Sequence, residues 1–235
     1  SEVFSNYTDF AAQDWIPERD LARHPKLGYV TPTLKNVVAV FTRHPEWRGV
    51  IAYDAFSGRI MKRQPPPFSH RELGEWSDFD DVHAQLWLSH HCGFEPKKQT
   101  LIDGVLATAD QQRYHHVRTY LDGLAWDKKP RIDTWLHEYL GAGGFYEPAD
   151  SPEEKHRKDL TNKFIMAAGR LWLISAVARI YRPGCRADHV LILEGKQRIG
   201  KSSALAVLGG EWFTDATLRM GDKEVLQLIR GKWIV

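Results

Sequence analysis

The feature that most constrains this chain of 235 residues is a short motif near its carboxyl end that holds two glycines, a lysine and a serine at fixed spacing. It fits the pattern G-x-x-x-x-G-K-[ST] and consists of Gly195, Lys196, Gln197, Arg198, Ile199, Gly200, Lys201 and Ser202. Glycines let the backbone curl so that successive N–H groups point inward at phosphate oxygens. Lys201 neutralises phosphate charge, which makes it the predicted catalytic residue, and the Ser202 hydroxyl ligates Mg²⁺. We therefore predict a nucleotide-binding loop, with Ser203 in the first turn of the helix that follows.

The segments around this motif are those that a phosphate-binding loop requires. Before it, His189–Leu193 is typical of a buried strand, and after it Ser202–Leu208 is helical. Two further strands are predicted at Trp212–Asp215 and Lys232–Val235, with a helix over Lys223–Ile229 between them. Strand, loop, helix, strand, helix and strand open a parallel α/β sheet, so the predicted fold class is a partial P-loop α/β domain.

A mainly α-helical domain is expected before this sheet, at residues 77–182. Its helices are predicted from Ser77 to Gly93, and over Lys98–Gln112, Val117–Leu124, Ile132–Leu140 and Pro152–Tyr181. Residues 1–76 form a small α+β region, with a helix over Thr33–Phe41 and a hairpin of Gly49–Tyr53 with Arg59–Met61. The third region, residues 183–235, is the first half of the P-loop domain.

Charge is distributed unevenly along the chain. The net charge is only +2, but residues 151–235 contain 15 Lys and Arg against 9 Asp and Glu. A basic carboxyl-terminal third favours a phosphate-bearing ligand.

Cysteine content and hydropathy point to a cytoplasmic protein. Cys92 and Cys185 are too few for a disulfide framework, and the sequence shows no secretory signal. The most apolar segment, Phe164–Ile180, is interrupted by Arg170 and Arg179 and is shorter than the roughly 20 residues of a membrane span. We interpret it as a buried helix and expect no membrane partner.

Four segments resemble, in order and spacing, the virulence-associated protein E family: Tyr120–Asp127, Pro130–Ile132, Arg182–Cys185 and His189–Ser203. The resemblance extends from about residue 80 to residue 235 and is loose over residues 1–79. Proteins of this family are P-loop ATPases of phages and genomic islands, related to superfamily-3 replicative helicases.

The resemblance implies a helicase-like ATPase of DNA replication, often joined to primase modules, with ATP and Mg²⁺ as cofactors. It implies DNA as a partner, either single-stranded or at a replication origin, and a homo-oligomeric ring in the cytoplasm of a bacterial host. By the same analogy, the helical domain serves as an assembly collar or a DNA-loading element.

Two departures from the family pattern affect the predicted site. Arg198 stands where such proteins often have glycine, so that its cation either alters nucleotide affinity or helps to bind the phosphates. The acidic residues that hold Mg²⁺ would follow Lys232–Val235, and the chain starts without methionine. We therefore expect a piece of a longer protein that lacks the hydrolytic residues. Asp215 is the one acidic candidate near the sheet, and a turn-capping role is favoured for it.

Other polar clusters give weaker indications. His83, His90, His91 and Cys92 lie close together but lack the ligand spacing of zinc sites, which favours solvated or capping histidines. The pair His115 and His116 lies near Arg113 and Arg118, and an exposed cluster is favoured there over a DNA-phosphate contact. Four aromatic residues are interpreted as packing groups rather than base-stacking platforms: Trp126, Trp135, Tyr139 and Trp172.

Two alternatives to a replication ATPase stay open. One is a P-loop small-molecule kinase or switch, which would be monomeric and indifferent to DNA. The other is a non-catalytic helical module that binds a partner protein and carries a vestigial loop.

Overall fold

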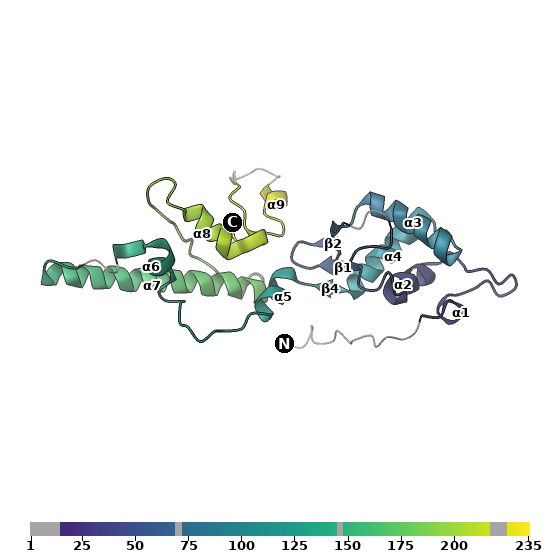
Figure 1. Cartoon of the computed structure of the whole chain (residues 1–235), viewed down its shortest axis with the longest axis horizontal. Helices are drawn as coiled ribbons and strands as arrows, with labels where there is room; N and C mark the ends of the chain where they lie inside the picture. Colours follow the sequence, from purple (N-terminus) through teal and green to yellow (C-terminus); the bar gives the residue numbers. More distant parts are fainter. Residues whose placement is uncertain (1–14, 69–71, 145–147, 217–224) are drawn as a thin grey trace. The chain divides into compact units, whose positions relative to one another are not determined.

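The computed structural model of the protein describes residues 15–68, 72–144, 148–216 and 225–235 (Figure 1). It is a mixed α/β structure, about half helical, with one small four-stranded sheet. The chain separates into two compact units, residues 1–115 and residues 116–235. The P-loop fold as such is not established by this arrangement, because the described part of the second unit forms no continuous sheet.

The first unit packs helices on one small sheet. Its elements are α1 (Pro17–Asp20), α2 (Leu34–Arg43), β1 (Ile51–Asp54), β2 (Arg59–Lys62), β3 (Gly74–Glu75), α3 (Asp78–Cys92), α4 (Lys98–Gln111) and β4 (Arg113–Tyr114). The strand order is β3-β2-β1-β4; β1 and β2 form the predicted hairpin, and β1 pairs with β4 in parallel. Helices α2 and α4 pack together, and α4 also packs on β1. This unit therefore includes α3 and α4, which the sequence suggested as part of a separate helical domain.

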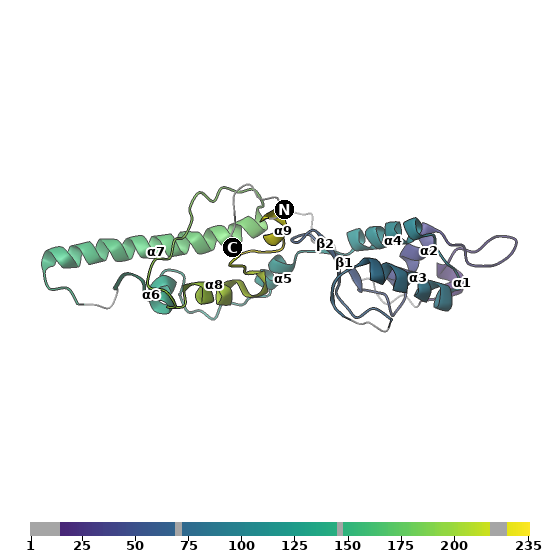
Figure 2. The ribbon, with the colours of Figure 1, turned by 90° about the horizontal axis from the view of Figure 1, so that it is seen from above.

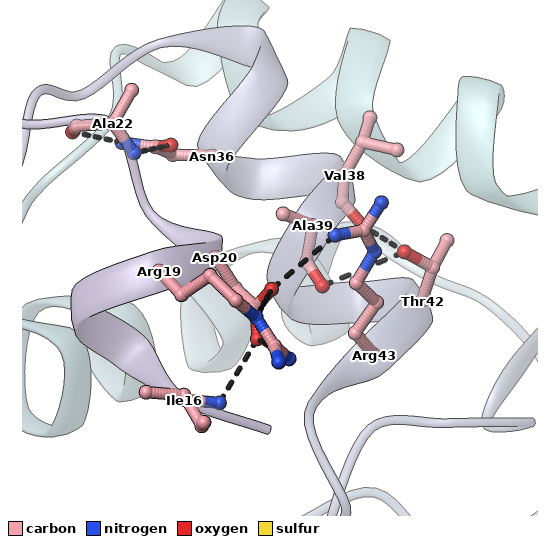
Figure 3. A network of polar contacts seen from close by, with 9 residues as sticks. All are labelled: Ile16, Arg19, Asp20, Ala22, Asn36, Val38, Ala39, Thr42 and Arg43. Atoms are coloured by element: carbon pink, nitrogen blue, oxygen red, sulfur yellow. Dashed lines mark hydrogen bonds and ion pairs between the residues drawn. The ribbon is translucent and has the colours of Figure 1, made fainter. Parts of the chain in front are cut away.

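A network of polar contacts fixes the amino-terminal segment of this unit on α2 (Figure 3). Asn36 is fully buried; its side chain accepts from Ala22 N at 2.7 Å and donates to the carbonyl oxygens of Ala22 and Thr31 at 2.8 Å. Nearby, the buried Asp20 carboxylate accepts from Arg19 at 3.1 Å and from Ile16 N at 2.9 Å, and these hydrogen bonds lower its pKa. The residues before α2 are thus held by hydrogen bonds as well as by apolar contact.

A buried ion pair joins β2 to the start of α3. Ser77 and Asp80 form a capping box at the helix amino terminus, and Lys62 Nζ lies 2.8 Å from Asp80 Oδ2. Burial alone would raise the pKa of Asp80, but hydrogen bonds from Lys62 and Ser77 outweigh this effect and lower it. The Lys62 and Asp80 side chains are only 10% and 7% exposed, while Ser77 lies at the surface.

The second unit is built around one long helix. Its elements are α5 (His116–Asp122), α6 (Trp135–Leu140), a 3₁₀ turn η1 (Ala142–Gly144), α7 (Pro152–Tyr181), α8 (Lys201–Gly209), a 3₁₀ turn η2 (Gly210–Trp212) and α9 (Val225–Leu228). Helix α6 lies beside α7 in both views (Figures 1 and 2), and they meet at Gly169, where a Cβ would lie 2.7 Å from Leu136 Cδ1. The other end of α7 is held by α5: Arg118 donates to the Ile180 carbonyl at 2.8 Å, and Tyr181 bonds Asp122.

The prediction that the apolar segment Phe164–Ile180 is a buried helix is wrong. It forms part of α7, but Gly169 and Ile180 are its buried residues, and Phe164 is 73% exposed. By length and composition alone α7 could cross a membrane, with an 18-residue window of mean hydropathy 1.4. An apolar composition shows that a helix has surface to bury and not what covers that surface.

The predicted strand at His189–Leu193 is absent. Residues 185–196 form no regular structure, and Val190 and Ile192 are 84% and 75% exposed. A strand exists only through hydrogen bonds to a neighbour, and none of the described residues supplies one here.

The other two predicted strands meet only at one point. Phe213 and Ile234 form a parallel bridge, and Thr214 N donates to the Ile234 carbonyl at 3.0 Å. Helix α9 lies inside the predicted helix over Lys223–Ile229, whose first two residues lie outside the described ranges. The parallel arrangement expected of these segments is therefore present, but as one bridge rather than as two strands.

Replacing Asn36 by alanine tests the polar network. The change leaves the Ala22 and Thr31 backbone groups without their buried partner, so we expect the free energy of unfolding of the first unit to fall by about 2–4 kcal/mol. Urea denaturation followed by tryptophan fluorescence measures this. Lys35→Ala, on the same helix but exposed, should change stability by less than about 0.5 kcal/mol. Equal effects of the two variants would contradict the assignment.

Candidate phosphate-binding loop

The motif folds as a loop that runs into the amino terminus of α8. The helix begins at Lys201, and its N-cap is Gly200, which has φ 88° and no side-chain cap. Helix amino termini carry unpaired N–H groups and a partial positive charge. Gly200 has no side chain, and no side-chain cap hydrogen bond is formed at this end of the nine-residue helix.

Both motif glycines have φ angles that residues with side chains rarely adopt. Gly195 has φ 155°, and a Cβ at this position would lie 2.7 Å from Ile199 Cδ1, closer than atoms can approach without a shift. Gly200 lies in the left-handed region, where side chains other than glycine are strained. The backbone turns over residues 197–200, and the inward direction of its N–H groups stays a prediction.

Lys201 closes the loop on itself. Its ammonium Nζ donates to the carbonyl oxygens of Gly195 and Lys196, each at 2.8 Å. The positive charge is therefore held between the start of the loop and the first turn of α8, where the helix N–H groups begin. Both printed partners of the ammonium are carbonyl oxygens, and its role toward a phosphate stays a prediction.

The remaining predicted residues line the same loop and its helix. The side chains of the following residues are exposed: Lys196, Gln197, Arg198, Ile199, Ser202 and Ser203. The structure thus brings the predicted set together on one exposed segment rather than in a closed cavity.

The residues fit a bound phosphate group better than a metal held by the protein alone. Ser202 offers one hydroxyl oxygen, and within the described ranges no three histidine, cysteine or acidic residues gather as a metal site. Mg²⁺ keeps most of its water and commonly needs few protein ligands when phosphates supply the rest. Asp215 is exposed, two residues after the bridged Phe213, and no contact assigns it to a metal.

The far end of α8 is fixed by close packing on the bridged pair. A Cβ at Gly209 would lie 2.9 Å from Phe213 Cβ and 3.2 Å from Ile234 Cβ. Next to it, the buried Trp212 ring lies 5.1 Å from the Tyr120 ring, and Trp233 Nε1 donates to the Ala176 carbonyl of α7 at 3.0 Å. These contacts position the helix that carries the loop.

An ion pair that sequence analysis missed shapes the connection between α5 and α6. Arg131 bonds both carboxylate oxygens of Asp127, at 2.7 and 2.9 Å. The hydrogen bond from Arg131 is the main cause that lowers the Asp127 pKa to about 2, so the pair is intact above pH 4 and is lost as pH falls through about 2. Opposite charges four residues apart were the available signal in the sequence.

The histidines of the other polar clusters contact groups within their own unit of the chain. His83 Nδ1 lies 2.7 Å from the Phe79 carbonyl, and the His91 ring stacks on Trp87. In the pair, the His115 ring packs on Phe56, while His116 faces Glu211 at 3.5 Å. These contacts give the histidines structural roles.

The four predicted packing aromatics divide into two groups. Trp135 is buried and stacks on Trp172 with ring centroids 5.9 Å apart, as predicted. Trp126 and Tyr139 are 72% and 62% exposed, so the prediction that they pack in a core is wrong. Helical spacing located these side chains on the chain but did not show which face is covered.

Comparison with protein-family models identifies residues 121–235 as a virulence-associated protein E-like domain. The matched segment takes in the Asp127–Arg131 pair, α7 and the whole phosphate-binding loop. A comparison with curated proteins gave no match.

Gly209→Ala tests the packing that holds α8. The added methyl must displace Phe213 or Ile234, so we expect the free energy of unfolding of the second unit to fall by about 1–3 kcal/mol. Thermal denaturation measures the effect. Gly123→Ala is the matched control because its Cβ would have neighbours at 3.4 Å or more, and it should change stability by less than about 0.5 kcal/mol. A larger loss at Gly123 than at Gly209 would refute the packing argument.

Proposed function

We propose that this chain, whose residues 121–235 are a virulence-associated protein E-like domain, binds ATP as the nucleotide-binding part of a DNA-replication ATPase. The observation that carries the proposal is the Lys201 ammonium, bonded to two carbonyls of the loop beside the uncapped amino terminus of α8. The family is associated with P-loop NTPases of phages and genomic islands, which agrees with this chemistry.

The loop supplies the donors that a phosphate needs. An ammonium has three N–H groups, and Lys201 uses two of them on Gly195 and Lys196. The third is left for a phosphate oxygen, and the N–H groups of the first helical turn meet the same anion. The ligand is thus bound by groups already in place, which lowers the ordering cost of binding.

Mg²⁺ would bind at Ser202 together with the phosphates. When bound, it would neutralise charge that develops on the transferred phosphoryl group. The chain's own part is to hold the phosphates on the backbone of residues 195–203 and to keep the Lys201 charge beside them.

Action on DNA is the finer part of the proposal. Its support is the +6 balance of residues 151–235 and the resemblance of the chain to a family related to replicative helicases. A ring of subunits that translocates on DNA would hydrolyse ATP between neighbours. A small-molecule kinase or switch, or a module with a vestigial loop, would show no such dependence on DNA.

Lys201→Ala should weaken ATP binding by at least about tenfold. A charge-assisted hydrogen bond to phosphate contributes roughly 1.5–3 kcal/mol, and the variant also loses the bonds that close the loop. Isothermal titration calorimetry on the whole chain measures the affinity, and circular dichroism checks the fold. Lys163→Ala removes the same charge from an exposed site on α7 and should leave ATP affinity unchanged. Equal affinity in wild type and Lys201→Ala would remove the proposal.

DNA binding should be electrostatic and largely indifferent to sequence. If the basic residues of the second unit neutralise phosphates, log affinity falls linearly with log salt, with a slope of about −0.7 per phosphate contacted on single strands. Fluorescence anisotropy with a labelled single-stranded oligonucleotide at several salt concentrations measures the slope. Absence of binding at low salt would count against the helicase assignment and leave the nucleotide site standing.

A further inference from the structure

Arg198 adopts a backbone conformation that arginine rarely takes. Its φ is +65°, and Lys128 is the other non-glycine residue with positive φ among the described residues. In the left-handed region Cβ lies too close to the following carbonyl, so side chains other than glycine, asparagine and aspartate are disfavoured there. The loop therefore carries a strained residue at a position where glycine would relieve the strain.

No contact within the described ranges accounts for an arginine at this position. The side chain is exposed, and its guanidinium forms no hydrogen bond or ion pair with any residue that the structure describes. By contrast, Lys201 is committed to two carbonyl oxygens of the same loop. Within the part of the chain that the structure describes, the charge of Arg198 thus has no partner.

We propose that Arg198 is a second phosphate-binding cation, which recognises the polyphosphate chain of the nucleotide and not its base. The inference rests on the proposed function. Residues 195–203 contain three cations, Lys196, Arg198 and Lys201, and no acidic residue. A guanidinium presents paired donors that match phosphate oxygens, and Arg198 lies three residues before Lys201 in the same loop.

If Arg198 binds the polyphosphate chain, removing its charge should lower the affinity for every polyphosphate ligand by the same factor. Arg198→Asn removes the charge but keeps a residue that tolerates positive φ, and Arg198→Lys keeps the charge. We expect Arg198→Asn to weaken ATP, GTP and inorganic tripolyphosphate by about fivefold each, and Arg198→Lys by less than about twofold. The thermal midpoint of ligand-free Arg198→Asn should not fall, because the strain is reduced.

The measurement is calorimetric titration of the whole chain with each ligand at one ionic strength. Arg186→Asn is the matched control, since it removes one positive charge from the same unit outside the loop, where Arg186 pairs with Asp188 at 3.3 Å. Its affinities should equal those of the wild type. A fivefold loss in this control as well would assign the effect to net charge and overturn the inference.

Three other outcomes would also overturn it. Tripolyphosphate affinity unchanged in Arg198→Asn but lost in Lys201→Ala would leave the proposed function intact and remove Arg198 from the site. Loss of ATP affinity without loss of tripolyphosphate affinity would place Arg198 against the nucleoside. Failure of the wild type to bind ATP or tripolyphosphate would remove the proposed function and this inference with it.

Discussion

The two hydrogen bonds from Lys201 to the carbonyls of Gly195 and Lys196 hold the candidate site in shape. They join the first residue of the loop to the first residue of α8, so the curve between them is fixed at both ends. The glycines make the curve sterically possible, and the ammonium makes it stable without a ligand. The same ammonium is the proposed phosphate ligand, so a change of this residue alters both the loop and the proposed contact.

Side chains pack closely against two glycines in the described part of the second unit. At Gly169 and Gly209 there is no room for a methyl group, so α7 meets α6 and α8 meets the bridged pair at glycine. Trp212 and Trp233 fill the space around the second of these contacts. Small residues at the crossing points and large aromatics beside them produce dense packing from few residues.

Sequence reasoning located most helices and the loop, because their signals are local. Proline and serine at the start of α7, the acidic first turn of α3 and the glycines of the motif act on neighbouring residues, and the structure agrees with them. The prediction of a strand at His189–Leu193 was wrong because a strand needs a neighbouring strand, which local sequence does not show. The predicted burial of Phe164 and Trp126 was wrong for a related reason. Periodicity gives the face of a helix on which a side chain lies and not what covers that face. The bonds of Lys201 and the strain at Arg198 depend on three-dimensional closure and have no signature in the motif alone.

The segment at residues 189–193, which forms no regular structure, leads within two residues to Gly195, where the loop begins. Its backbone donors and acceptors are unused by any neighbouring strand that the structure describes. A chain that pairs with this segment would restrict Gly195, and a ligand that orders the loop would restrict the segment. If pairing of this segment changes the affinity of the loop for its ligand, then ligand binding changes the affinity of the pairing by the same factor.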